Sequence, residues 1–119
     1  MAGTIRVGII GAGAMGEAHL AGYAQLPDVE VVGIATRTRE RGEALAARFG
    51  LDPSAVFSDT DALLAAARPD GVSICTNDNQ HVGPTLAALE AGVDVLLEKP
   101  IAGDVAGAET IAAAVHRTG

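Results

Sequence analysis

The chain alternates between short apolar runs and longer segments whose apolar residues recur at helical spacing. The apolar runs predict strands over residues 5–10, 29–35, 56–57, 72–75 and 93–97. The remaining segments predict helices over residues 16–26, 39–49, 60–67, 80–91 and 105–117. Near-continuous apolar strands that alternate with helices are typical of a parallel sheet covered on both faces, so we predict an α/β doubly wound fold.

Residues with particular backbone preferences mark the ends of these helices. Gly50 and Gly92 follow two of the helices, and glycine readily adopts the left-handed conformation that ends a helix. Asp59 or Thr60 is expected to cap the helix over 60–67. In the helix over 16–26, five residues are expected to face the sheet: Ala18, Leu20, Ala21, Ala24 and Gln25.

The first predicted strand leads into a glycine-rich turn with the spacing G-x-G-x-x-G. A strand, then these glycines, then a helix is the arrangement that seats a dinucleotide pyrophosphate, although similar turns also occur where nothing binds. Gly11 permits the tight turn, Gly13 lets the phosphates approach the backbone, and Gly16 lets the helix pack closely on the strand. The expected phosphate-binding residues are Gly11, Gly13, Ala14, Met15 and Gly16. This turn favours a Rossmann sheet with strand order 3-2-1-4-5.

A basic segment follows the second predicted strand, beginning 20 residues beyond Gly16. It reads T-R-T-R-E-R from Thr36 and holds three of the eight basic residues. A dinucleotide fold that prefers NAD usually has an acidic residue here, whereas arginine accommodates the 2′-phosphate of NADP. We expect Thr36, Arg37 and Arg39 to bind the cofactor, and we favour NADP(H) over NAD(H). A solvated basic helix start is the alternative.

Polar residues also follow the fourth predicted strand, in the order T-N-D-N-Q-H from Thr76. One interpretation is ordinary capping of the next helix. The other is a ligand site, because ligands bind where the strand order reverses, between strands one and four. On that interpretation Thr76, Asn77 and His81 border the nicotinamide. His19 and His116 are expected to be surface or packing residues.

The fifth predicted strand ends in Glu98-Lys99-Pro100, which contains the chain's single lysine. A lysine at the carboxyl end of a strand can donate a hydrogen bond to a substrate oxygen or exchange a proton with it. We therefore expect Lys99 to be catalytic. The alternative is a solvated lysine paired with Glu98.

Composition narrows the classes of partner. The 119 residues suffice for one domain with its own core. The net charge of −7 disfavours nucleic acid and anionic lipid, and no apolar run approaches the roughly 20 residues of a membrane span. The single cysteine, Cys75, excludes an intramolecular disulfide and agrees with a cytoplasmic location. No metal site is predicted.

Several stretches together resemble the N-terminal domain of the glucose-fructose oxidoreductase, inositol dehydrogenase and rhizopine-catabolism family (Gfo/Idh/MocA). They are G-A-G-A-M-G-E-A-H, R-E-R-G-E-A-L-A-A-R-F-G, the T-x-x-x-x-H turn and A-L-E-A-G-V-D-V-L-L-E-K-P, and they span nearly the whole chain. The resemblance implies an NAD(P)-dependent oxidoreductase acting on sugars, cyclitols and related alcohols or carbonyls. It also implies that Lys99 lies at the active site and that Glu98 lines the nicotinamide side.

Two departures from the family accompany this resemblance. Asn77 and Asp78 stand where the family commonly has proline and then asparagine. Family members also continue into a sixth strand and an α+β substrate domain, so the chain resembles an isolated dinucleotide-binding domain with little activity of its own.

The sequence leaves two further functional classes open. They are a non-catalytic nucleotide-binding module and an NAD-dependent eliminase or glycosidase-type relative. The fifth strand would also be an exposed apolar edge in this chain, so we expect a homodimer.

Overall fold

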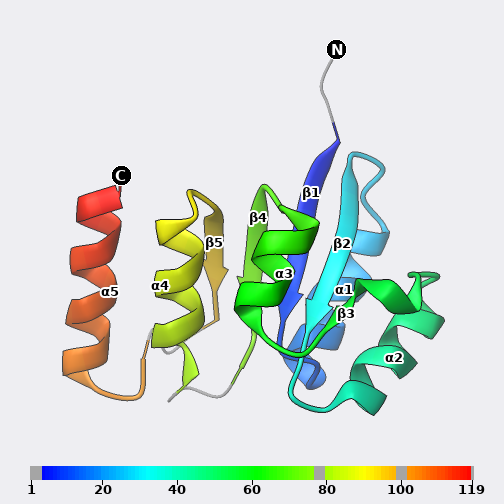
Figure 1. Cartoon of the computed structure of the whole chain (residues 1–119), viewed down its shortest axis with the longest axis horizontal. Coiled ribbons are helices and arrows are strands. Elements are labelled where there is room, and N and C mark those ends of the chain that lie inside the picture. Colours follow the sequence, from blue (N-terminus) through cyan, green and yellow to red (C-terminus); the bar gives the residue numbers. More distant parts are fainter. Residues whose placement is uncertain (1–3, 77–79, 99–101, 119) are drawn as a thin grey trace.

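The computed structural model describes residues 4–76, 80–98 and 102–118, and its centre is a parallel sheet (Figure 1). The sheet has five strands in the order β3-β2-β1-β4-β5, and every pair of neighbours is parallel. The strands are β1 Ile5–Ile10, β2 Val29–Ala35, β3 Val56–Phe57, β4 Gly71–Ile74 and β5 Asp94–Leu97. The predicted Rossmann fold and strand order are confirmed.

Helices cover both faces of this sheet. They are α1 Ala14–Ala24, α2 Arg39–Arg48, α3 Thr60–Ala67, α4 Val82–Glu90 and α5 Val105–Thr118, with a short 3-10 helix η1 Pro53–Ala55 before β3. In Figure 1, α3 and α4 lie in front of the sheet, α1 lies behind it, and α5 flanks α4. None of the helices among the described residues has the length and apolar character needed to cross a membrane.

Two apolar cores hold these layers together, one on each face. On the α1 and α2 side, Leu20 and Leu45 pack against Ile9 and Ile34 of the sheet. On the α3 and α4 side, the core consists of Ile10, Ala35, Leu63, Ala67, Val72, Ile74, Ala88 and Val93. Alternate residues of a strand point to opposite faces, so adjacent Ile9 and Ile10 serve the two different cores.

The sheet-facing side of α1 differs from the prediction. Ala18, Ala24 and Gln25 are exposed, whereas Gly16 and Leu20 are buried. The helix begins at Ala14 rather than at residue 16, and contact between Gly16 and the glycine turn sets its rotation. Residues three and four apart share a helix face, so Gly16 brings His19, Leu20 and Tyr23 to the sheet.

Candidate functional site

Four residues form a row along the carboxyl edge of the sheet, each directly after a strand. The row runs Thr36, Gly11, Cys75 and Glu98, following β2, β1, β4 and β5. Each residue donates its backbone N–H to the last carbonyl of the neighbouring strand, at 2.7 to 3.1 Å. The row spans three inter-strand spacings, roughly 14 Å. Sheet hydrogen bonding therefore fixes the relative positions of all four strand ends.

A cleft of about 580 Å³ lies over this edge. Its floor is the glycine turn from Ile10 to Gly13, and its walls come from the ends of β2, β3 and β4 and from the start of α4. The side chains that line it include Thr36, Arg37, Arg41, Ser58, Asp59, Thr60, Cys75, Thr76, Gln80 and Pro84. It lies where the strand order reverses, the expected place for a ligand in this fold.

The three glycines of the turn have different surroundings. Gly11 has φ +104°, a conformation that favours glycine, and this turns the chain into the cleft floor. A Cβ on Gly16 would lie 2.0 Å from the Gly11 carbonyl oxygen, so close packing of α1 depends on this glycine. A Cβ on Gly13 would meet nothing within 4 Å. The space above Gly13 is therefore open to a ligand.

The N-terminus of α1 adjoins that open space. Gly13 is the N-cap residue and offers no side-chain hydrogen bond to the first turn, in which Ala14 and Met15 are the leading residues. Uncapped N–H groups and the helix dipole attract an anion. The backbone of Gly13 and of this first turn thus fits the phosphate-binding role predicted for it.

The basic segment after β2 presents two arginines to the cleft. Arg37 and Arg41 line it, whereas Arg39 lies 3.2 Å from Glu43 in an exposed pair along α2. Thr36 uses its hydroxyl oxygen to accept from the Thr38 N–H at 3.1 Å. The cofactor-binding residues predicted from sequence included Arg39 and omitted Arg41. The i,i+4 spacing of Arg39 and Glu43, which predicts an ion pair along the helix, was the signal that could have distinguished Arg39 from Arg41.

Arg37 also reaches across the cleft towards α4. Its Nη1 and Nη2 lie 2.7 and 3.0 Å from the Gln80 side-chain oxygen when that amide is oriented to accept. Gln80 belongs to the turn between β4 and α4, so the two residues join opposite walls of the cleft.

Residues after β3 complete the wall beside Arg37. Ser58, Asp59 and Thr60 line the cleft, and Asp59 Oδ1 accepts from the Ala62 N–H at 2.7 Å, which caps α3 as expected. Their place in the site was not predicted from the sequence, although the predicted order 3-2-1-4-5 puts β3 next to β2. This segment adds a carboxylate to the same wall as the two arginines.

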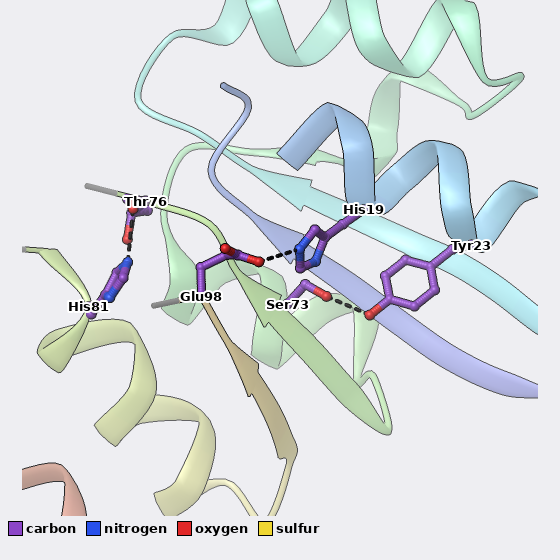
Figure 2. Close-up of polar contacts among 6 residues, drawn as sticks. All are labelled: His19, Tyr23, Ser73, Thr76, His81 and Glu98. Carbon is purple, nitrogen blue, oxygen red and sulfur yellow. Dashed lines mark hydrogen bonds and ion pairs between the residues drawn. The ribbon is translucent and has the colours of Figure 1, made fainter. Parts of the chain in front are cut away.

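Two hydrogen bonds connect Thr76, in the turn after β4, to Gln80 and His81, directly before α4. Thr76 Oγ1 donates to the Gln80 carbonyl at 3.2 Å. His81 Nε2 donates to the Thr76 carbonyl at 2.9 Å (Figure 2). His81 is 1% exposed, and the part of the lining that the structure describes includes Thr76 but not His81. Asn77 lies outside the described residues. The geometry gives His81 the role of holding the Thr76 backbone.

The end of β5 brings together two residues that the sequence did not pair. His19 Nε2 lies 2.9 Å from Glu98 Oε1 (Figure 2), so His19 is more than the surface or packing residue expected. Beside them, burial raises the pKa of the Cys75 thiol to about 12, with a smaller contribution from the negative charge of Glu98. Lys99 lies outside the described residues.

Comparison with known proteins shows the family. Residues 5–119 match the family model GFO_IDH_MocA, described as an oxidoreductase family with an NAD-binding Rossmann fold. This chain belongs to that family. The predicted resemblance is confirmed, and the chain is similar to the NAD-binding domain of sugar and cyclitol dehydrogenases.

Individual relatives illustrate the range of this family. The D-glucoside 3-dehydrogenase of Escherichia coli K12 is 39% identical over 97 residues, which cover 81% of this chain and 27% of that protein. The scyllo-inositol dehydrogenase of Lactobacillus casei, solved with NAD(H) and scyllo-inositol, has a TM-score of 0.89 at 26% identity. The 3-ketoreductase KijD10 of Actinomadura kijaniata, solved with NADP, has a TM-score of 0.83 at 32% identity. These alignments cover 97% of this chain, and 34% and 36% of those two proteins.

Proposed function

We propose that the cleft binds a nicotinamide dinucleotide across the carboxyl edge of the sheet. Its adenosine half lies between the β2 and β3 ends, its pyrophosphate lies on the Gly11 to Gly16 turn, and its nicotinamide points towards Cys75 and Glu98. The observation that carries this proposal is the open space above Gly13, bounded by the uncapped N-terminus of α1. The cofactor donates or accepts the hydride, and the fold positions it.

We further propose that the chain prefers NADP(H) to NAD(H). Arg37 and Arg41 are the cationic groups in the described lining, and they stand where a 2′-phosphate on the adenosine ribose would lie. The Asp59 carboxylate on the same wall is already engaged as the cap of α3. Related structures contain either cofactor, so the preference depends on these residues rather than on the family.

A calorimetric titration with NADPH and NADH tests this preference. We expect NADPH to bind more tightly, and Arg37→Ala to weaken NADPH binding about tenfold while changing NADH binding little, because a charge-assisted phosphate contact is lost. Arg39→Ala is the matched control, since Arg39 faces Glu43. Equal affinity of the unaltered chain for both cofactors would overturn the preference.

For the whole protein we propose hydride transfer between C4 of the nicotinamide and a sugar-like or cyclitol carbon that bears a hydroxyl or carbonyl. Lys99 is the proposed catalytic residue, donating to the substrate oxygen or exchanging its proton. The chain spans about a third of the length of the relatives it matches, so substrate contacts made outside these 119 residues are part of this proposal.

Lys99→Ala should leave cofactor binding unchanged and abolish turnover by the complete enzyme. Unchanged turnover would favour a non-catalytic nucleotide-binding module.

Two further predictions from the sequence accompany this proposal. We propose a homodimer, because β5 is an edge strand and Leu96 is 55% exposed. A cytoplasmic location also stays a prediction.

A further inference from the structure

The carboxylate of Glu98 is held in place by a residue from another element. His19 of α1 lies 2.9 Å from it, and because an ionised carboxylate only accepts hydrogen bonds, the imidazole Nε2–H is the donor (Figure 2). The side chains of His19 and Glu98 are 13% and 27% exposed. This shielding and the hydrogen bond together fix where the negative charge lies.

A second contact fixes the His19 ring itself. Tyr23 lies one turn further along α1, with its ring centroid 6.4 Å from that of His19 in an edge-to-face arrangement. The Tyr23 hydroxyl forms a 2.5 Å hydrogen bond with Ser73 Oγ, which is buried in β4 (Figure 2). The ring therefore lies between a carboxylate and a tyrosine tied to the sheet, and its orientation is set from both sides.

The two ends of the strand edge carry opposite charges. Arg37 and Arg41 lie at the β2 end, and Glu98 lies at the β5 end, roughly 14 Å away along the edge. The negative charge of Glu98 contributes to the raised pKa of Cys75, so its field reaches a residue of the cleft wall. NADP carries a negative 2′-phosphate at its adenosine end, and its nicotinamide ring, at the other end, is positive only in the oxidised form.

Building on the proposed cofactor site, we propose that the Glu98 carboxylate, held by His19, increases the affinity of the cleft for the oxidised cofactor relative to the reduced cofactor. The oxidised ring carries one positive charge that the reduced ring lacks, so a fixed negative charge nearby attracts only one of the two forms. Glu98 is then the residue that sets the redox preference. His19 acts through Glu98 and is a positioning residue.

Calorimetric titrations of the 119-residue chain test this inference with three ligands. NADP⁺ and NADPH report on the redox preference, and 2′-phospho-ADP-ribose reports on the adenosine and pyrophosphate sites alone, because it has no nicotinamide. We expect Glu98→Gln to raise the dissociation constant of NADP⁺ about fivefold relative to that of NADPH. This is the size of effect that the loss of one partly screened charge pair produces. Binding of 2′-phospho-ADP-ribose should not change, which also shows that the variant is folded.

Three comparisons separate a charge effect from a structural one. Glu90→Gln removes an equal charge from a carboxylate paired with Arg117, and it should leave the ratio unchanged. His19→Ala should shift the ratio in the same direction as Glu98→Gln, whereas His19→Gln keeps an N–H donor and should largely restore it. In about 1 M salt the effect of Glu98→Gln should shrink, because salt screens partly exposed charges.

The result that would overturn the inference is an unchanged ratio in Glu98→Gln while both cofactor forms still bind. An equal shift in Glu90→Gln would also overturn it, because the effect would then follow the net charge of the protein. If the unaltered chain binds none of the three ligands, the proposed function fails as well. That outcome is distinct from retained binding with an unchanged ratio.

Discussion

Gly13 and Gly16 belong to the same turn but have opposite requirements. A Cβ on Gly16 would collide with the Gly11 carbonyl, whereas a Cβ on Gly13 would project into open space. We expect Gly16→Ala to lower the free energy of unfolding by about 3 kcal/mol, because backbone cannot yield as a flexible side chain does. Gly13→Ala should change stability by less than about 1 kcal/mol but weaken cofactor binding.

Urea unfolding followed by circular dichroism, together with NADPH titration, measures both effects. Gly22→Ala is the control, because a Cβ there also meets nothing within 4 Å and Gly22 lies in the last turn of α1, away from the glycine turn. It should stabilise the chain by up to about 1 kcal/mol through helix propensity and leave binding unchanged. Equal loss of stability in Gly13→Ala and Gly16→Ala would contradict the assigned roles.

The environment of Cys75 predicts how the reactivity of its thiol and the stability of the chain depend on pH. Its pKa is raised from the ordinary 9.0 to about 12, chiefly by burial and secondarily by Glu98. Because the thiolate is the reactive form, a disulfide reagent should modify Cys75 slowly at pH 8 in the folded chain and rapidly in urea. The unfolded thiol ionises first, so this group's contribution to stability is complete below pH 9 and decreases as the pH rises towards 12.

The absorbance of the thiolate that the disulfide reagent releases measures the reaction rates in the folded and unfolded chain. The same chain with and without urea provides the control. Equal rates in the folded and unfolded chain at pH 8 would show that Cys75 is accessible and ionises normally.

The roles of the turn glycines were easier to predict from the sequence than the direction in which a helix side chain points. The roles of Gly11 and Gly16 depend on local spacing, and the structure agrees with both. His19 and Arg41 were missed because their place in the site depends on the rotation of a helix. In α1 that rotation is set by contact between Gly16 and Gly11, which a count of apolar residues in the helix does not include.

At the scale of elements, two adjacent strands leave a notch that seats α3. Gly8 of β1 pairs with Gly33 of β2, and a Cβ on either would lie within 3.1 Å of the Leu63 side chain. Leu63 is fully buried in this notch. We expect Leu63→Ala to cost about 3 kcal/mol of stability, because the removed side chain leaves a cavity against strand backbone.

Chemical denaturation measures this loss, and Leu26→Ala is the control because Leu26 is 49% exposed. The control should change stability by less than about 1 kcal/mol. If Leu63→Ala were equally mild, α3 would not depend on the glycine notch for its docking.

Elements were predicted more reliably than their ends. Apolar runs located all five strands, and Gly50 and Gly92 have the positive φ values expected where helices end. The start of α4 was predicted at residue 80 but lies at Val82, because hydrogen bonds between Thr76, Gln80 and His81 belong to the preceding turn. These bonds form across the turn, so periodicity does not show them.

At the scale of the whole molecule, the β5 edge predicts self-association. A hollow lined by Tyr23, Val95 and Leu96 lies beside this edge, and Leu96 is exposed. We expect light scattering to give twice the chain mass of 11.9 kDa, and Leu96→Lys to give the monomer, because a charge blocks pairing along an apolar edge. Leu26→Lys is the control and should remain dimeric. A monomer at every concentration tested would refute the homodimer.

The most direct measurement of the central claim, that this cleft holds a nicotinamide dinucleotide, is amide chemical-shift mapping of the isotope-labelled chain during titration with NADPH. We expect saturable shifts at Gly11, Gly13, Thr36 and Thr76, at the ends of β1, β2 and β4. Ile111, in the middle of α5, should not shift. The absence of saturable shifts, or largest shifts outside the cleft, would contradict the proposed binding site.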